Sequence, residues 1–168
     1  MTNHRVKNIL TTFLKRLDAG VGNVIELINE LPYQRIVTTR CKREEIFDLY
    51  QLGLFHCGND QHNGTIVQAH AQYNQTEIME LVGLQPHAQY SRHYHKNSAA
   101  VIYIISGLGT FLCGDALIRY HPGMRMTIPA GMLHGFNTQS RTFFLSIQTP
   151  PIIHPESGEI DLHYPEGE

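Results

Sequence analysis

The sequence has 168 residues, of which 42% are hydrophobic and 17% charged, and its formal net charge is −2. This length predicts one domain with a short extension, and the composition excludes a disordered chain. The nearly balanced charge argues against a nucleic-acid-binding protein, which would carry a basic excess.

Residues 1–60 are predicted to form a helical N-terminal extension. Apolar residues spaced three and four apart predict a helix over 6–17, and a second apolar set predicts another over 24–31. The β-branched residues within 33–41 predict a short strand. Residues 42–51, rich in lysine, arginine and glutamate, predict a third short helix.

Residues 61–150 have the sequence pattern of a β-barrel. A turn-rich segment at 56–64 marks the boundary with the helical extension. Short β-prone runs follow at regular spacing, as is typical of an all-β sandwich or barrel. These runs are 65–71, 77–84, 99–105, 109–113, 116–120, 124–128 and 142–148. Residues 151–168, which contain Pro151, Pro155 and Pro165, are predicted to form an extended C-terminal tail.

The cysteines and the N-terminal residues indicate the compartment. Cys41, Cys57 and Cys113 are an odd number at wide spacing, so they fit neither a zinc motif nor a secreted disulfide framework. The first residues lack the apolar run of a signal peptide, and no stretch has the ~18 apolar residues of a membrane span. We therefore expect a cytoplasmic protein without membrane or nucleic-acid partners.

Three histidines form the candidate metal site. Residues two apart on a strand point to the same face, so an extended segment would present His93 and His95 to one interior. His134, in a turn before an apolar run, could supply a third ligand from the same wall. Three neutral imidazoles suit Zn, Fe, Cu or Ni.

Two segments resemble the motifs of the cupin family. The segment from His87 to Gly107 resembles the first motif, G-x5-H-x-H-x3-4-E-x6-G, and Gly123 to Asn137 resembles the second, G-x5-P-x-G-x2-H-x3-N. The proline, all three histidines and the glycines other than the first fall in register, while Asn137 stands one residue early. The resemblance covers about residues 65–150. It implies a mainly β fold, a double-stranded β-helix or cupin jelly roll, to which the helical extension is added.

The chain departs from the first motif at two positions. His87 stands at the first glycine, which indicates a local difference in the backbone. Ala100 stands at the metal-binding glutamate, so that His93, His95 and His134 remain as the metal ligands. A three-histidine shell gives a divalent ion no compensating negative charge, and it therefore favours an anionic, chelating ligand.

Within the cupins, such a shell is similar to that of thiol and β-diketone dioxygenases. The resemblance thus implies an Fe(II)-dependent dioxygenase acting on a small anionic organic molecule. Zn, Ni or Mn would instead favour isomerase or hydrolytic chemistry. Two other functions stay open: a metal-dependent isomerase or epimerase of a sugar-like compound, and a small-ligand-binding cupin without catalysis.

Further residues are candidates for the lining of the pocket. Gln89 and Ser91 share strand parity with His93, and Ala100 and Ile102 share one face of the next predicted strand. We expect these four residues to contact the substrate.

Metal-bound histidines usually need hydrogen-bond partners, for which Gln68, His70 and Glu80 are candidates on the preceding strands. Cupins commonly dimerise, so the resemblance also implies a homodimer.

Overall fold

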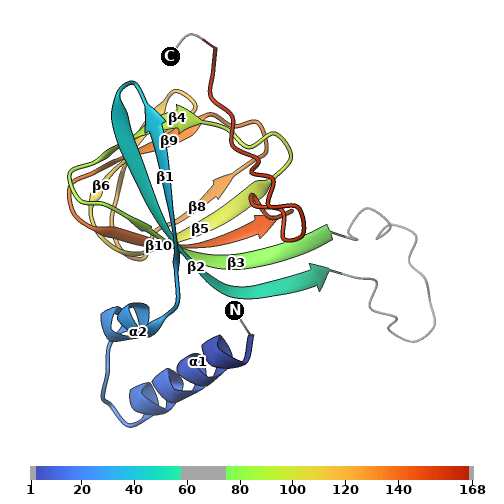
Figure 1. Cartoon of the computed structure of the whole chain (residues 1–168). Helices are drawn as coiled ribbons and strands as arrows, with labels where there is room; N and C mark the ends of the chain where they lie inside the picture. Colours follow the sequence, from blue (N-terminus) through green and yellow to red (C-terminus); the bar gives the residue numbers. More distant parts are fainter. Residues whose placement is uncertain (1–2, 58–74, 167–168) are drawn as a thin grey trace, which may run out of the picture.

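Two antiparallel β-sheets make up most of the structure, a computed structural model that describes residues 3–57 and 75–166 (Figure 1). Within these residues the helices are α1 (Asn3–Asp18) and α2 (Val24–Glu30). In the same residues the strands are β1 (Gln34–Arg40), β2 (Arg43–Cys57), β3 (Gln75–Leu84), β4 (Gln89–His93), β5 (Ala99–Ser106), β6 (Gly109–Cys113), β7 (Ala116–Tyr120), β8 (Arg125–Ile128), β9 (His134–Thr138) and β10 (Thr142–Thr149).

The strand order identifies the architecture. One sheet has the order β1-β2-β3-β10-β5-β8, and the other has the order β4-β9-β6-β7. Strands far apart in the sequence, such as β3 and β10, are paired, whereas the consecutive strands β5 and β6 lie in different sheets. The link between β5 and β6 turns at Gly107, where φ is 100° and a Cβ would lie 2.7 Å from the Thr142 Cα. The predicted mainly β fold, a double-stranded β-helix, is confirmed.

The predicted helix over 42–51 is wrong, because Arg43–Cys57 is strand β2. The charged residues of this segment favour a helix locally. In the structure, however, the segment pairs with β1 along one edge and with β3 along the other. Its side chains alternate, so that Phe47 and Leu49 face the interior while Tyr50 packs toward the helices. Two hydrogen-bonded ladders and burial on both faces therefore override helix propensity.

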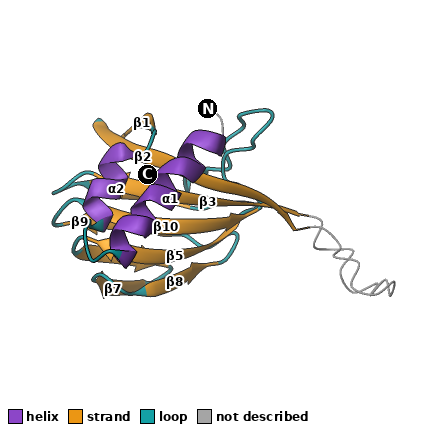
Figure 2. Cartoon of the chain, turned by 90° about the horizontal axis from the view of Figure 1, so that it is seen from below, coloured by secondary structure: helices purple, strands orange, loops and turns teal. Residues whose placement is uncertain are grey.

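The helical arm, residues 3–31, covers the outer face of the six-stranded sheet (Figure 2). Asn23 caps α2 by accepting a hydrogen bond from the Glu26 N–H at 3.1 Å. Ile28 and Leu31 are buried against the outer face of the sheet. Both predicted helices of the arm are confirmed.

Strand alternation gives the six-stranded sheet two apolar faces. On β3, Leu81 packs with the helical arm, whereas Val82 and Leu84 belong to the core between the sheets. On β5, Ile102 is buried in that core, and Tyr103 on the opposite face is 38% exposed. The inner faces of the two sheets therefore enclose the apolar interior in which a site can be built.

The predicted β runs between residues 77 and 148 all coincide with strands. The run predicted at 65–71 and the boundary predicted at 60/61 lie outside the described residues. The division into an extension, a barrel and a tail stays a prediction, although β1 and β2, from within the predicted extension, join the six-stranded sheet. None of the described helices is long and apolar enough to cross a membrane.

Residues 151–166, here called the C-terminal strap, run along the outside of the barrel without forming a long strand (Figure 1). Isolated β-bridges join Tyr94 to His163 and Ile153 to Ile160. The strap therefore contacts the segment that follows β4, which contains His95, one of the three predicted metal ligands.

Candidate metal centre

The three predicted histidines are brought together and buried. His93 ends β4, His95 follows two residues later, and His134 begins β9. One ring nitrogen from each histidine lies within 4.8 Å of the corresponding nitrogens of the other two, so the three could hold a metal ion. The ring centroids are 4.4 Å apart for His93 and His134, and 5.0 Å apart for His95 and His134.

A backbone carbonyl fixes the tautomer of each ring. The Nδ1 atoms of His93, His95 and His134 lie 2.9, 2.6 and 2.8 Å from the carbonyl oxygens of Ser91, Asp161 and Met132. Because a carbonyl oxygen can only accept, each Nδ1 must carry the proton and donate it. The three Nε2 atoms are then unprotonated in the neutral rings, which is the form that binds a metal.

The surroundings keep these rings neutral. Burial lowers the pKa of His93 to about 3, with a further decrease from the nearby His134. Burial also lowers the pKa of His134 to about 4 and lowers that of His95. The donor set therefore needs no deprotonation near neutral pH before it binds a cation.

These residues fit a divalent metal. Three convergent imidazoles with fixed rings are a donor set for Zn, Fe, Cu or Ni. The clustered metal-ligating groups of the described residues contain no carboxylate. A metal held here would keep open coordination positions, which a ligand could occupy.

The three histidines form part of the wall of an interior cavity of about 130 Å³. Most of this wall is apolar and comes from both sheets and from the strap. The other lining residues are Ile36, Thr38, Phe47, Leu49, Glu80, Val82, Leu84, Tyr90, Ala100, Ile102, Ile128, Phe136, Phe144, Ser146, Gln148, Ile152, Ile153, Ile160 and Leu162. A ligand in this cavity would contact mostly hydrocarbon.

The four predicted substrate-contacting residues separate into two pairs. Ala100 and Ile102 line the cavity, as their strand parity requires. Gln89 and Ser91 are not among the described residues that line it. The pairing of β4 with β9 shifts register between Tyr90 and His93, so that Tyr90 shares the inner face with His93. This bulge breaks the alternation on which the prediction for Gln89 and Ser91 depended.

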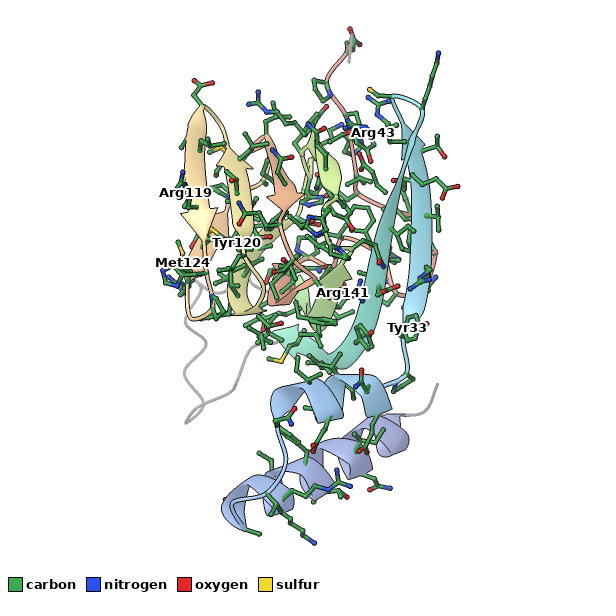
Figure 3. All side chains as sticks on the ribbon, turned by 90° about the vertical axis from the view of Figure 1, so that its left-hand side faces the viewer. Tyr33, Arg43, Arg119, Tyr120, Met124 and Arg141 are labelled. Carbon is green, nitrogen blue, oxygen red and sulfur yellow. The ribbon has the colours of Figure 1, made fainter. Side chains whose placement is uncertain are left out.

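Gln89 and Ser91 have partners outside the cavity. Arg43, which lies at the end of the barrel away from the helical arm (Figure 3), donates a hydrogen bond to the Gln89 side chain. The Ser91 N–H donates to the buried Glu45 carboxylate at 2.7 Å, while the Ser91 carbonyl accepts from His93. Glu45 on β2 therefore helps to hold Ser91, whose carbonyl orients His93.

The strap supports His95 in a comparable way. The Asp161 carboxylate accepts hydrogen bonds from the N–H groups of Lys96, Asn97 and Ser98 at 2.8, 2.8 and 2.9 Å. Its own carbonyl accepts the bond from His95. Burial opposes ionisation of Asp161, but the hydrogen bonds outweigh it and lower the pKa of this carboxyl to about 2. Sequence reasoning missed this residue, because nothing local links position 161 to position 95.

One of the predicted partner residues reaches the cavity itself. Glu80, on β3, lines the wall and is only 6% exposed. Burial raises the pKa of its carboxyl, and a hydrogen bond from Gln148 offsets this in part. Gln68 and His70 lie outside the described residues.

The comparisons agree with this architecture. The family described as "Cupin domain" matches residues 80–147. KdgF from Halomonas sp. has a TM-score of 0.50 at 14% identity, covering 73% of this chain and 91% of that chain. A predicted oxalate decarboxylase from Thermotoga maritima has a TM-score of 0.50 at 17% identity, with 73% and 96% of the two chains covered. These likenesses show the same fold.

A third similar structure is larger than this chain. It is a sugar phosphate isomerase from Silicibacter pomeroyi, with a TM-score of 0.44 at 23% identity. The alignment covers 63% of this chain and 60% of that chain, so this chain spans less than two thirds of its length. No protein with a curated description matches the sequence.

Proposed function

Residues 80–147 match the family described as "Cupin domain", and from this premise we propose that the chain is a metal-dependent dioxygenase of a small anionic organic molecule. We favour Fe(II), held by His93, His95 and His134. The observation that carries the proposal is a buried set of three neutral imidazoles whose Nε2 atoms are available, with no carboxylate in the group among the described residues.

The charge of the site supports an anionic substrate. Three neutral imidazoles leave the +2 charge of a divalent ion uncompensated, and Ala100 contributes a methyl group to the cavity wall. Attraction between opposite charges is stronger in a poorly polarisable interior than in water. An enolate, thiolate or carboxylate therefore fits this site better than a neutral group.

A bound Fe(II) ion would supply the redox chemistry that reaction with O2 needs. The chain itself supplies position and exclusion of water. The Nδ1–H bonds hold the three rings in place, and the apolar walls keep bulk water from the reacting part of the substrate. Ile152 and Leu162 of the strap form part of these walls.

A second function, a metal-dependent isomerase or epimerase, is favoured by one observation. Such a reaction moves protons on the substrate and needs a general acid or base in the cavity. Glu80 is a carboxyl in the cavity wall, and burial raises its pKa above the ordinary value. A mostly apolar wall suits a sugar-like compound poorly, so we rank this function second.

The test is metal content, measured by elemental mass spectrometry on protein purified without an affinity tag or chelator. The variant carrying both His93→Ala and His134→Ala removes two ligands. His121→Ala removes an exposed imidazole and serves as the matched control. We expect near-stoichiometric iron in the natural protein and the control, and none in the double variant.

Oxygen uptake then tests the reaction. The iron-loaded protein is mixed anaerobically with small carboxylates, thiols and β-diketones, and O2 consumption is followed after air is admitted. Uptake that needs both a substrate and the histidines supports the dioxygenase. Stoichiometric zinc, nickel or manganese would favour the isomerase instead. Absence of any metal, even after reconstitution, would refute the metalloenzyme and leave a small-ligand-binding cupin. The homodimer and the cytoplasmic location stay predictions.

A further inference from the structure

The wall of the cavity contains one acidic residue among the described residues, Glu80, and it is not part of the histidine group. Thr38, Ser146 and Gln148 are the other polar lining residues apart from the histidines and Tyr90. The Tyr90 hydroxyl is already bonded to the Ile46 carbonyl at 2.6 Å. A carboxyl placed in a mostly apolar wall, outside the metal-binding cluster, therefore needs an explanation of its own.

The orientation of Glu80 is fixed through Gln148. The Ile152 N–H donates to Oε1 of Gln148 at 2.9 Å, so the amide nitrogen of Gln148 must point the other way. That nitrogen donates to Oε1 of Glu80 at 2.9 Å and to the Ser146 hydroxyl at 3.1 Å. The strap thus sets the amide, and the amide holds one carboxyl oxygen of Glu80 in place.

Sheet register places this pair beside the position that lacks the glutamate of the cupin motif. Gln148 on β10 pairs with Ala100 on β5, and Ser146 pairs with both Ile102 and Glu80. Gln148 and Ala100 both line the cavity, and Ala100 contributes only a methyl group to the wall there. Among the described residues, Gln148 is the side chain that hydrogen-bonds to the Glu80 carboxyl. Burying a carboxyl with so little compensation is costly, and the cost falls when a ligand donates a further hydrogen bond.

We propose that Glu80 is a specificity-determining residue, which accepts a hydrogen bond from a hydroxyl or amino group on the part of the substrate that does not bind the metal. The inference rests on the proposed function, because it takes the anionic end of the substrate to lie at the histidines. Apolar cavities of about 150 Å³ bind benzene, so a cavity of about 130 Å³ suits a molecule of about that size. The substrate class is a small monocyclic or branched molecule with an anionic group, an apolar body and one hydrogen-bond donor.

Isosteric probes test this inference. The metal-loaded protein is titrated by calorimetry with acetate, benzoate, 3- and 4-hydroxybenzoate, and 3- and 4-methylbenzoate. The 2-hydroxy isomer is omitted because its hydroxyl can itself bind the metal. A hydroxyl that meets a buried carboxyl is expected to bind at least tenfold more tightly than the methyl group of the same size. We expect this preference for at least one of the two ring positions.

Variants assign the preference to Glu80. Glu80→Leu should abolish or reverse it, and Glu80→Gln should retain part of it because an acceptor oxygen remains. Glu77→Gln changes an acidic residue of the same strand that is not among the described lining residues, and it should leave the preference unchanged. Metal content and thermal unfolding of each variant establish that the fold and the histidine site are intact. If Glu80→Leu fails to fold, the hydroxyl preference of Glu80→Gln tests the role of Glu80 instead.

The outcomes separate this inference from the proposed function. Failure of every carboxylate, acetate included, to bind in a manner that depends on the metal would overturn the proposed function. Binding of acetate but of no benzoate would overturn the substrate class. A hydroxyl preference that Glu80→Leu leaves unchanged, or no hydroxyl preference in the natural protein, would overturn the role of Glu80 while the metal site stands.

Discussion

Replacing Asp161 should weaken metal binding, although this residue donates no ligand to the cluster. Its carboxylate holds the N–H groups of residues 96–98, and its carbonyl orients His95 at 2.6 Å. The carbonyl remains in Asp161→Ala, but the three bonds that fix its position are lost. Removal of groups that orient metal ligands typically costs 10–100-fold in affinity. We expect a loss in this range for Asp161→Ala and a smaller one for Asp161→Asn, which retains one acceptor oxygen.

The same substitution should lower stability. Each hydrogen bond to a charged group contributes about 1.5–3 kcal/mol, and water replaces part of this when the loop opens. A decrease of about 2–4 kcal/mol in the free energy of unfolding of the metal-free protein is therefore expected. The folded-state pKa of Asp161 is about 2, below the ordinary value of 3.8. Its contribution should thus be complete above about pH 4 and disappear as the pH falls toward 2.

The assay is a competitive titration of the metal against a chromophoric chelator, combined with urea unfolding of the metal-free protein. Glu159→Ala, an exposed acidic residue of the same strap, is the matched control and should change neither quantity. If Asp161→Ala binds the metal as tightly as the natural protein but is less stable, the proposed link between Asp161 and the metal ligand His95 is refuted. Asp161 would then anchor the strap without positioning His95.

Three further predictions follow from the structure. Asp48 is buried and forms ion pairs with Arg35 at 2.7 Å and with Arg141 at 2.6 Å. Asp48→Asn should therefore lower the free energy of unfolding, measured by urea titration, by about 3 kcal/mol. An unchanged urea midpoint would contradict this prediction. Burial opposes ionisation of Asp48, but the two arginines outweigh it and lower the pKa of this carboxyl, so the effect should shrink as the pH falls below 3.8. His87 has a φ of 51°, a backbone conformation that glycine adopts more readily than histidine. His87→Gly should therefore stabilise the fold by up to about 1 kcal/mol. A lower melting temperature of this variant in calorimetry would exclude backbone strain at His87. Ala100→Glu adds a negative charge beside the three histidines, so it should raise the affinity for a divalent metal at least tenfold and weaken the binding of acetate. If the variant binds acetate as tightly as the natural protein, charge does not explain the preference for an anionic ligand.

The sequence alone was sufficient for the fold class and for the grouping of three histidines that could hold a metal. The spacing of His93 and His95 places both rings on one side of an extended segment, a consequence of backbone geometry that needs no knowledge of distant partners. The regular spacing of short β-prone runs and the resemblance to both cupin motifs predicted the barrel. Ala100 at the glutamate position already indicated a shell without a carboxylate, and the structure places that residue in the cavity wall.

Only the tertiary structure decided what surrounds the cluster. The bulge in β4 turns Gln89 and Ser91 away from the cavity. Pairing on both edges makes residues 43–51 part of strand β2 despite their helix propensity. Asp161 reaches His95 across 66 positions, and Gln148 reaches Glu80 across 68. Local patterns follow from the geometry of a few neighbouring residues. Contacts over such separations depend on how two sheets and a strap pack together, and no segment of the sequence encodes that packing by itself.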